Sequence, residues 1–333
     1  MKAFLVGATV LFGCYKNVPA PAPQPAQSAP LSASSPVPDY RAALGDPVGF
    51  LPVDSELVLA IDGEQVRNSP LWTFADQKLR ATAGASFTTF TTTCGFDPIT
   101  SIRGITVGLR GIKRDTPEGV VVVSGISRTK MTDCLERAAA SASATLVVDR
   151  GVFTIRRDST DPTSMTFTFV DDATAVILIS PSADRSGLEK VLASGAPLRR
   201  SPTFTQLLAQ VDTSASVWGI LNGKSSIFDL AQGNQKPSAV WGSVHLANGA
   251  SIAMRIRFAD TAVAQQLATQ AQTQLQGAAQ MFFDRLDVNA DGNELVVDAT
   301  MSETKLASLM SLMGMAMQAQ APTPPTAPAL GGP

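Results

Sequence analysis

Hydrophobic and polar residues alternate along the chain in two periods, one typical of strands and one typical of helices. Leu57, Leu59 and Ile61 alternate with their neighbours as in a strand, whereas Val120–Val123 is a continuous β-branched run. Such a run is typical of a strand that is buried on both faces. Ser127 is placed to cap a helix whose apolar stripe includes Met131, Cys134 and Leu135. The alternation of strands and helices predicts an α+β fold.

One hairpin can be predicted down to its register. Two alternating segments, 240–246 and 252–258, flank the turn signal Asn248-Gly249. A two-residue loop would place His245 opposite Ile252 and mix apolar and polar side chains on each face. A three-residue loop, 247–249, with Gly249 in the left-handed region pairs Val244 with Ile252 and keeps one face apolar. We therefore predict the three-residue loop.

The body of the chain divides into two stretches with similar patterns. Ser201-Pro202 matches Ser69-Pro70, and the predicted helix 261–275 matches the helix that follows Ser127, at offsets of roughly 110–140 residues. We predict mainly antiparallel sheets with helices packed on one side, in two related, duplicated units. The units are residues 40–200 and 201–320. The alternative is that αβ proteins repeat such patterns without duplication.

The N-terminus has the features of an export signal. Lys2 precedes an apolar run over residues 3–12, which is too short to span a bilayer. The segment Leu11–Cys14 resembles the bacterial lipobox. The resemblance implies that residues 1–13 are a lipoprotein signal peptide and that Cys14 is diacylated, with palmitate as a typical acyl chain, so that the protein meets the lipid membrane there. The alternative is a buried N-terminal strand that ends in a free cysteine.

The residues after Cys14 have the composition of a tether. Residues 18–39 contain seven prolines and no charge before Asp39, which favours extended polyproline II. We predict that residues 14–39 form a Pro-rich tether and that residues 321–333 form a disordered Pro-rich tail. Tyr15 and Lys16 follow the lipobox in place of the aspartate that marks inner-membrane retention. By resemblance to sorted lipoproteins, this favours the outer membrane.

Two cysteines, Cys94 and Cys134, remain once Cys14 is assigned to lipid. In an exported protein an even pair is a disulfide candidate, and closing the 40-residue loop would contribute roughly 3–4 kcal/mol in the chain-entropy model. The alternative is that Cys134, on an apolar helical stripe, is a buried thiol.

The sharpest metal motif is an aspartate-rich loop near the C-terminal end. Asp287, Asn289, Asp291 and Asp298, with Gly292, match the spacing of oxygen ligands in a calcium-binding loop. The flanks favour a different interpretation, because Leu295-Val296-Val297 is strand-like and Asn-Ala-Asp-Gly is a good hairpin turn. Both a calcium site and a plain hairpin stay open, and no other cofactor is predicted.

Composition excludes some functions. The formal net charge of −2 removes the electrostatic case for a nucleic-acid partner. The single imidazole, His245, has no carboxylate near it in sequence and no nucleophile-elbow Gly-x-Ser-x-Gly accompanies it, so we predict no catalytic residue.

Three short segments carry a further resemblance: Leu51–Ser55 (Leu-Pro-x-Asp-Ser), Ser69–Trp72 (Ser-Pro-Leu-Trp) and Cys94–Pro98 (Cys-Gly-Phe-Asp-Pro). In these the chain resembles uncharacterised bacterial envelope lipoproteins. The resemblance implies an exported, lipid-anchored and non-catalytic protein that binds an envelope protein or ligand or has a structural role. The alternatives are an envelope hydrolase with a dispersed Asp/Glu/Ser site and a carrier of an apolar ligand between sheet and helices.

Overall fold

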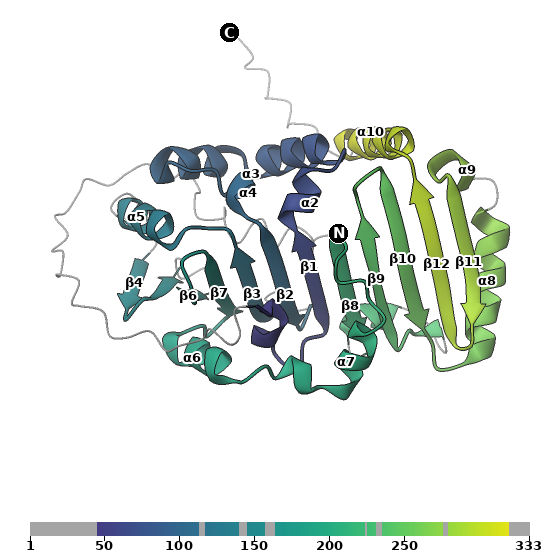
Figure 1. Ribbon diagram of the computed structural model, residues 1–333, viewed down its shortest axis with the longest axis horizontal. Helices are drawn as coiled ribbons and strands as arrows, with labels where there is room; N and C mark the ends of the chain where they lie inside the picture. Colours follow the sequence, from purple (N-terminus) through teal and green to yellow (C-terminus); the bar gives the residue numbers. More distant parts are fainter. Residues whose placement is uncertain are drawn as a thin grey trace, which may run out of the picture.

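The computed structural model describes residues 45–112, 117–139, 145–156, 164–223, 225–230, 235–275 and 279–319. The strands in these ranges form one antiparallel sheet of twelve strands (Figure 1). Their order across the sheet is β11-β12-β10-β9-β8-β1-β2-β3-β7-β6-β5-β4. The predicted α+β class with antiparallel pairing is confirmed, with both predicted units contributing strands to a single sheet.

The strands of the first half lie on one side of the β1–β8 pair: β1 (Leu57–Asp62), β2 (Gly104–Arg110), β3 (Glu118–Ser124), β4 (Thr145–Asp149), β5 (Val152–Arg156), β6 (Ser164–Phe169) and β7 (Thr174–Ser180). The strands of the second half lie on the other: β8 (Val217–Asn222), β9 (Ala239–His245), β10 (Ala250–Arg257), β11 (Arg285–Asp291) and β12 (Glu294–Met301).

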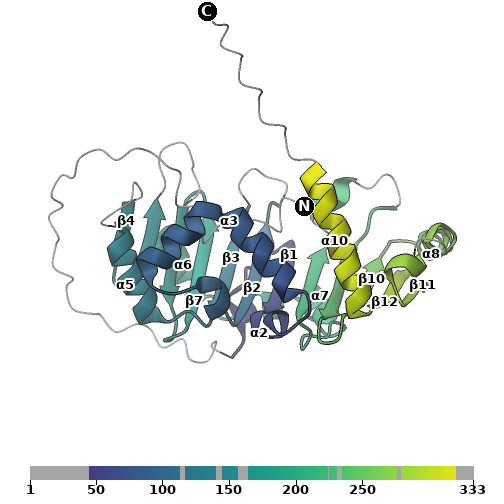
Figure 2. The ribbon, with the colours of Figure 1, turned by 90° about the horizontal axis from the view of Figure 1, so that it is seen from above.

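Helices cover both faces of the sheet, whereas the sequence predicted one covered side. One face, the long-helix face, carries α3 (Trp72–Cys94), α5 (Arg128–Ala139), α8 (Thr261–Leu275) and α10 (Glu303–Ala319). Of these helices, α3 and α10 lie in front of the strands in Figure 2. The opposite, short-helix face carries η3 (Pro47–Phe50), α6 (Arg185–Ala193), η4 (Leu198–Arg200) and α7 (Pro202–Leu208). The remaining short elements are α2 (Gly63–Arg67), α4 (Pro98–Ser101), η5 (Ser226–Leu230) and α9 (Ala279–Phe282).

Strand β3 shows why two covered faces are needed. Val120 and Val122 are 0% and 3% exposed and belong to the core under the short-helix face. Val121 and Val123 are also buried, but they belong to the core under α5. Successive side chains in a strand point to opposite faces, so a run of four valines buries itself only between two layers.

The core under the short-helix face continues from one half of the chain into the other. It joins Val58 of β1 and Val120 of β3 to Trp218 of β8 and Trp241 of β9. Strands β1 and β8 pair directly, with Leu59 opposite Gly219. The two predicted units therefore share one sheet and one core.

The hairpin β9–β10 has the predicted register. Val244 lies opposite Ile252 and His245 lies opposite Ser251. Gly249 has φ +101°, a left-handed conformation that glycine adopts at no steric cost. The three-residue loop is confirmed.

The strand order shows a similar layout on either side of the β1–β8 pair. After three adjacent strands, a helix (α5 or α8) carries the chain to the outer edge, from which the following strands return inward. A duplication of sequence stays a prediction, as do the boundaries of the two units. The predicted signal peptide, residues 1–13, the tether 14–39 and the tail 321–333 lie outside the described residues.

Candidate functional site

The single imidazole lies in a polar cluster at one end of strands β8 and β9. His245, the last residue of β9, places its Nε2 atom 2.8 Å from Oδ2 of Asp212, which precedes β8. The two side chains are 43% and 49% exposed. Sequence analysis missed this carboxylate because it lies 33 residues away and reaches His245 only through the pairing of β8 with β9.

The hydrogen bonds of Asp212 decide what this pair can do. Its Oδ1 atom accepts bonds from the hydroxyl of Ser214 at 2.6 Å and from the Ser214 backbone N–H at 2.9 Å. These two bonds, and then His245, lower the pKa of Asp212 below its ordinary value. In a Ser-His-Asp site the imidazole stands between serine and carboxylate and removes the serine proton. Here the carboxylate stands in the middle, and the Ser214 hydroxyl donates to it.

A second serine in the cluster is buried in a structural role. Ser216 is 2% exposed; its hydroxyl donates to Oε1 of Gln65 at 3.0 Å and accepts from the N–H of Leu246 at 3.1 Å. Gln65, on α2, in turn donates to the carbonyl of Ser214 at 3.0 Å and to Asp62 at 3.1 Å. The cluster thus fastens α2 and the loop before β8 to the ends of β1 and β9.

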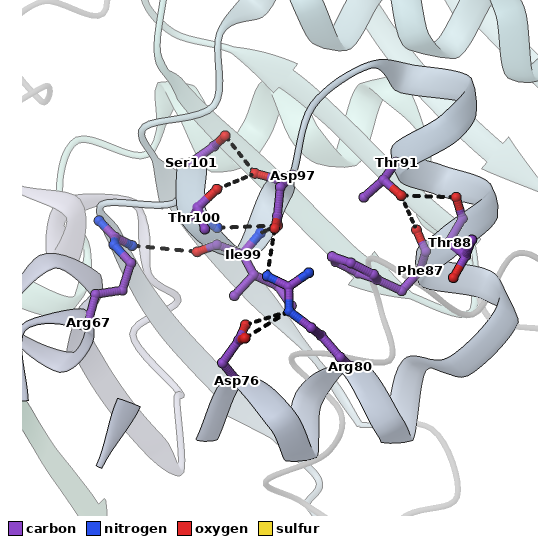
Figure 3. Close-up of polar contacts among 10 residues, drawn as sticks. All are labelled: Arg67, Asp76, Arg80, Phe87, Thr88, Thr91, Asp97, Ile99, Thr100 and Ser101. Atoms are coloured by element: carbon purple, nitrogen blue, oxygen red, sulfur yellow. Dashed lines mark hydrogen bonds and ion pairs between the residues drawn. The ribbon is translucent and has the colours of Figure 1, made fainter. Parts of the chain in front are cut away.

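The Cys94–Pro98 segment forms another polar network, drawn in Figure 3. Oδ1 of Asp97 accepts the backbone N–H of Ile99 at 2.8 Å and so caps α4, while Oδ2 accepts Nη2 of Arg80 at 2.7 Å. Arg80 also bonds both oxygens of Asp76 at 2.8 Å, and its guanidinium lies 4.7 Å from the ring centre of Phe87. The hydrogen bonds that Arg80 donates to the carboxylates of Asp76 and Asp97 raise its pKa.

These contacts indicate that the Cys94–Pro98 segment stabilises a bend in helix α3. Within α3, Gly84 has φ +51° and ψ −134°, so the helix is broken there into two parts. Arg80 lies before the break, and Asp97 follows the second part. The ion pair therefore spans the break, and the Cys94–Pro98 segment has a structural role in this fold.

The structure pairs Cys94 with Cys134, with their Cα atoms 4.4 Å apart, so the predicted disulfide is confirmed. It joins the end of α3 to the middle of α5, where Cys94 and Cys134 are 5% and 1% exposed. Cys14, the predicted lipidation site, lies outside the described residues.

The four candidate calcium ligands lie on a β-hairpin. Asp287, Asn289 and Asp291 are alternate residues of β11, and Asp298 of β12 lies opposite Asp287. At about 3.4 Å per residue, Asp287 and Asp291 are about 14 Å apart along the strand, too far to share one ion. Asp287 pairs with Arg285, and Asp291 lies 3.6 Å from Arg255. No group of three or more His, Cys, Asp or Glu side chains in the described ranges is placed to hold a metal ion.

A groove of about 360 Å³ lies between α8 and the edge strand β11. Its lining residues are Ala271, Gln272, Leu275, Phe283, Asp284, Arg285, Leu286, Asp287, Val288 and Asn289. Nε2 of Gln272 donates to the carbonyl of Val288 at 2.7 Å and so satisfies one backbone group of the edge strand.

The rim of the groove is apolar on one side and charged on the other. On the apolar side, Leu275 is 39% exposed. Asp284 bonds the N–H of Ser302 and lies 3.2 Å from Nζ of Lys305, and these contacts lower its pKa. Since Arg285 pairs with Asp287, the charges along the wall are balanced. Such a groove suits an uncharged or amphipathic ligand.

In the described part of the chain, no helix has the length and hydrophobicity needed to cross a membrane.

Comparison with protein-family models finds no match, and no curated protein matches the sequence. Solved structures of TP0453 do match. Crystal form III of TP0453 is 11% identical, with a TM-score of 0.54, over 80% of this chain and 98% of TP0453. Crystal forms IV and I are each 12% identical, with TM-scores of 0.52 and 0.53 and similar coverage. At this level of identity the likeness shows a shared fold.

Proposed function

We propose that the protein is a lipid-anchored, non-catalytic protein of the bacterial cell envelope with a binding or structural role. In this proposal residues 1–13 are removed and Cys14 is diacylated. Residues 18–39, at about 3.1 Å per residue, hold the folded body on the order of 70 Å from the membrane. The residues after Cys14 favour the outer membrane.

The observation that supports a non-catalytic role is the arrangement around His245. A general base must accept a proton from a nucleophile within hydrogen-bond reach. In this cluster the Ser214 hydroxyl donates to Asp212, and Ser216 is buried and donates to Gln65. The side chains that resemble a hydrolase site are engaged in holding the β8–β9 end of the sheet together.

A second candidate function is carriage of an apolar ligand. The groove between α8 and β11 favours it, because Leu275 and Phe283 line a space between sheet and helix. Its volume of about 360 Å³ is at the lower end of the range for small-molecule sites, so one short chain or ring system would fill it.

The anchor is tested by the intact mass of the native protein, extracted in detergent without reductant. We expect a chain that begins at Cys14 and carries added acyl mass. Cys14→Ser should abolish both the acyl mass and the extraction into detergent. An unprocessed chain that begins at Met1 would contradict the export proposal.

The two binding roles and the hydrolase alternative are separated by two further measurements. Native mass spectrometry should show co-purified lipid if the protein is a carrier, and Ala271→Trp, which fills the groove, should remove it. Ala262→Trp, an exposed position on α8 that does not line the groove, is the matched control. Turnover in a panel of ester, peptide and glycoside substrates, abolished by Asp212→Asn, would overturn the non-catalytic proposal.

A further inference from the structure

The two edges of the sheet differ in how they are protected. Strand β11 forms one edge of the sheet. There α8 lies alongside it, and the Gln272 side chain donates a hydrogen bond to the carbonyl of Val288. Strand β4 (Thr145–Asp149) closes the other edge. There Val147 is 43% exposed and Val148 is 41% exposed. An edge strand with exposed apolar side chains is a template for pairing with another strand.

The hydrogen-bond alternation shows which backbone groups of β4 are free. Strands β4 and β5 are joined by the two-residue loop Arg150-Gly151, whose φ values of 49° and 77° are those of a type I′ turn. In such a hairpin the residues flanking the loop, Asp149 and Val152, bond each other. Counted from Asp149, every second residue of β4 therefore directs its backbone N–H and C=O groups toward β5. The N–H and C=O groups of Leu146 and Val148, which lie between these residues, point away from the sheet.

A bond elsewhere in the sheet gives the same result. The N–H of Val170 bonds the carbonyl of Thr174, which fixes the alternation between β6 and β7. The same alternation can be followed through the registers of the β6–β5 and β5–β4 pairs. It again directs the backbone N–H and C=O groups of Leu146 and Val148 away from the sheet. No described residue is hydrogen-bonded to these outward groups.

We propose that β4 pairs with β4 of a second copy of this chain, antiparallel, about a two-fold axis at Val147. In this register Leu146 lies opposite Val148 of the other copy, and the same pair recurs on the far side of the axis. Both residues present outward backbone groups, so two complete hydrogen-bonded pairs form. A two-fold axis at Leu146 or at Val148 would leave only one such pair within the strand.

The charges of β4 are compatible with self-pairing. The only charged residue of the strand, Asp149, would lie opposite Thr145 of the other copy, so no like charges face each other. Asp149 is already neutralised by Arg185, at 2.7 Å. Val147 would face its own counterpart, and the exposed valines of both copies would become buried. A self-complementary edge of this kind gives a closed, two-fold dimer rather than an open chain.

Cysteine substitution tests the register directly, in the full chain carrying Cys14→Ser so that no third thiol interferes. Val147→Cys places two thiols in a non-hydrogen-bonded pair, where the Cα atoms are about 4.5 Å apart and a disulfide fits. We expect it to form a covalent dimer under mild oxidation. Leu146→Cys and Val148→Cys should each link poorly alone but link to each other when the two variants are mixed.

The matched control is Val53→Cys, since Val53 is 57% exposed in a loop far from β4 in the sequence. Equal cross-linking by Val147→Cys and Val53→Cys would overturn the proposal. Efficient self-linking by Val148→Cys in place of Val147→Cys would overturn the proposed axis.

Light scattering over a range of concentrations provides an independent measurement. We expect the unmodified protein to approach twice the monomer mass as concentration rises. Val147→Lys should keep it monomeric with an unchanged far-ultraviolet spectrum, whereas Val53→Lys should leave the dimer intact. A monomer at every concentration, together with no cross-linking at Val147→Cys, would show that this edge does not pair with itself.

Discussion

Asp97 supports the bent helix through two separate functions, and they can be separated by substitution. It caps α4 through the N–H of Ile99 and it bonds Arg80 across the break in α3. Asp97→Ala removes both, and we expect a loss of about 2 kcal/mol of unfolding free energy. Asp97→Asn retains a good capping group and should lose roughly half as much. The measurement is the urea concentration at the midpoint of unfolding. It is compared between variants whose unfolding free energy depends on urea concentration with the same slope.

The control for this prediction is an exposed ion pair. Asp54 bonds Arg110 at 2.6 Å, but the two side chains are 53% and 46% exposed. Asp54→Ala should therefore cost less than about 0.5 kcal/mol. Equal losses for Asp54→Ala and Asp97→Ala would show that the network around Arg80 contributes no more than a surface pair.

The lowered pKa of Asp212 leads us to expect that the stability of the folded protein depends on pH in the acid range. The Ser214 hydroxyl, more than any other group, lowers the pKa of Asp212. A lowered pKa means that the folded state binds the proton more weakly than the unfolded state. The stabilisation is therefore complete above the ordinary aspartate pKa of about 4 and is lost as pH falls through the folded value.

Ser214→Ala should raise the pKa of Asp212 toward its ordinary value, as followed by carboxyl chemical shifts. The difference in stability between the two proteins should vanish below the folded pKa. Ser182→Ala, at a surface serine that bonds Ser180, is the control. If the pKa of Asp212 were unchanged in Ser214→Ala, the Ser214 hydroxyl would not be the main cause of the lowered value.

At the scale of elements, the disulfide fixes α3 to α5 across a loop of 40 residues. In the chain-entropy model, removing it should destabilise the protein by about 4 kcal/mol. The measurement compares urea unfolding of the oxidised protein with that of the Cys94→Ala/Cys134→Ala variant. Cys14→Ser should have no effect on unfolding. Titration of the unfolded, unreduced protein should find neither Cys94 nor Cys134 as a free thiol.

The geometry of the β11–β12 hairpin leads us to expect that the protein does not bind calcium there. Its acidic residues are spread along two strands, and two of them lie beside arginines, so they do not converge on one ion. We expect no heat in a calorimetric titration with calcium and no rise in the melting temperature. Saturable heat that is lost in Asp287→Asn would instead support the calcium site.

The elements that could be predicted from the sequence are those fixed by local pattern. The β9–β10 register was predictable because a slip of one residue would move every side chain to the wrong face. The break at Gly84 was not, since glycine within a long helical stretch does not specify its conformation. The pairing of Asp212 with His245 depends on the order of β8 and β9 in the sheet, which no local pattern encodes.

At the scale of the whole molecule, the two predicted units are joined by one sheet and one shared core. Trp218 and Trp241 come from the second half, yet they pack in the same core as Val58 and Val120 from the first. The backbone of Glu56 bonds both Leu109 and Asn222, which ties β1 to strands on either side of it. Separating the halves would expose this core and leave β1 and β8 as unpaired edges.

We therefore expect urea unfolding to occur in a single transition. Tryptophan fluorescence reports mainly on the shared core, whereas far-ultraviolet circular dichroism reports on all strands and helices. The two curves should coincide, as two-state unfolding requires. Trp218→Phe, which keeps an apolar ring in the shared core, should move both curves together to lower urea. If circular dichroism instead showed a second transition that this substitution does not move, the halves would unfold independently despite their common sheet.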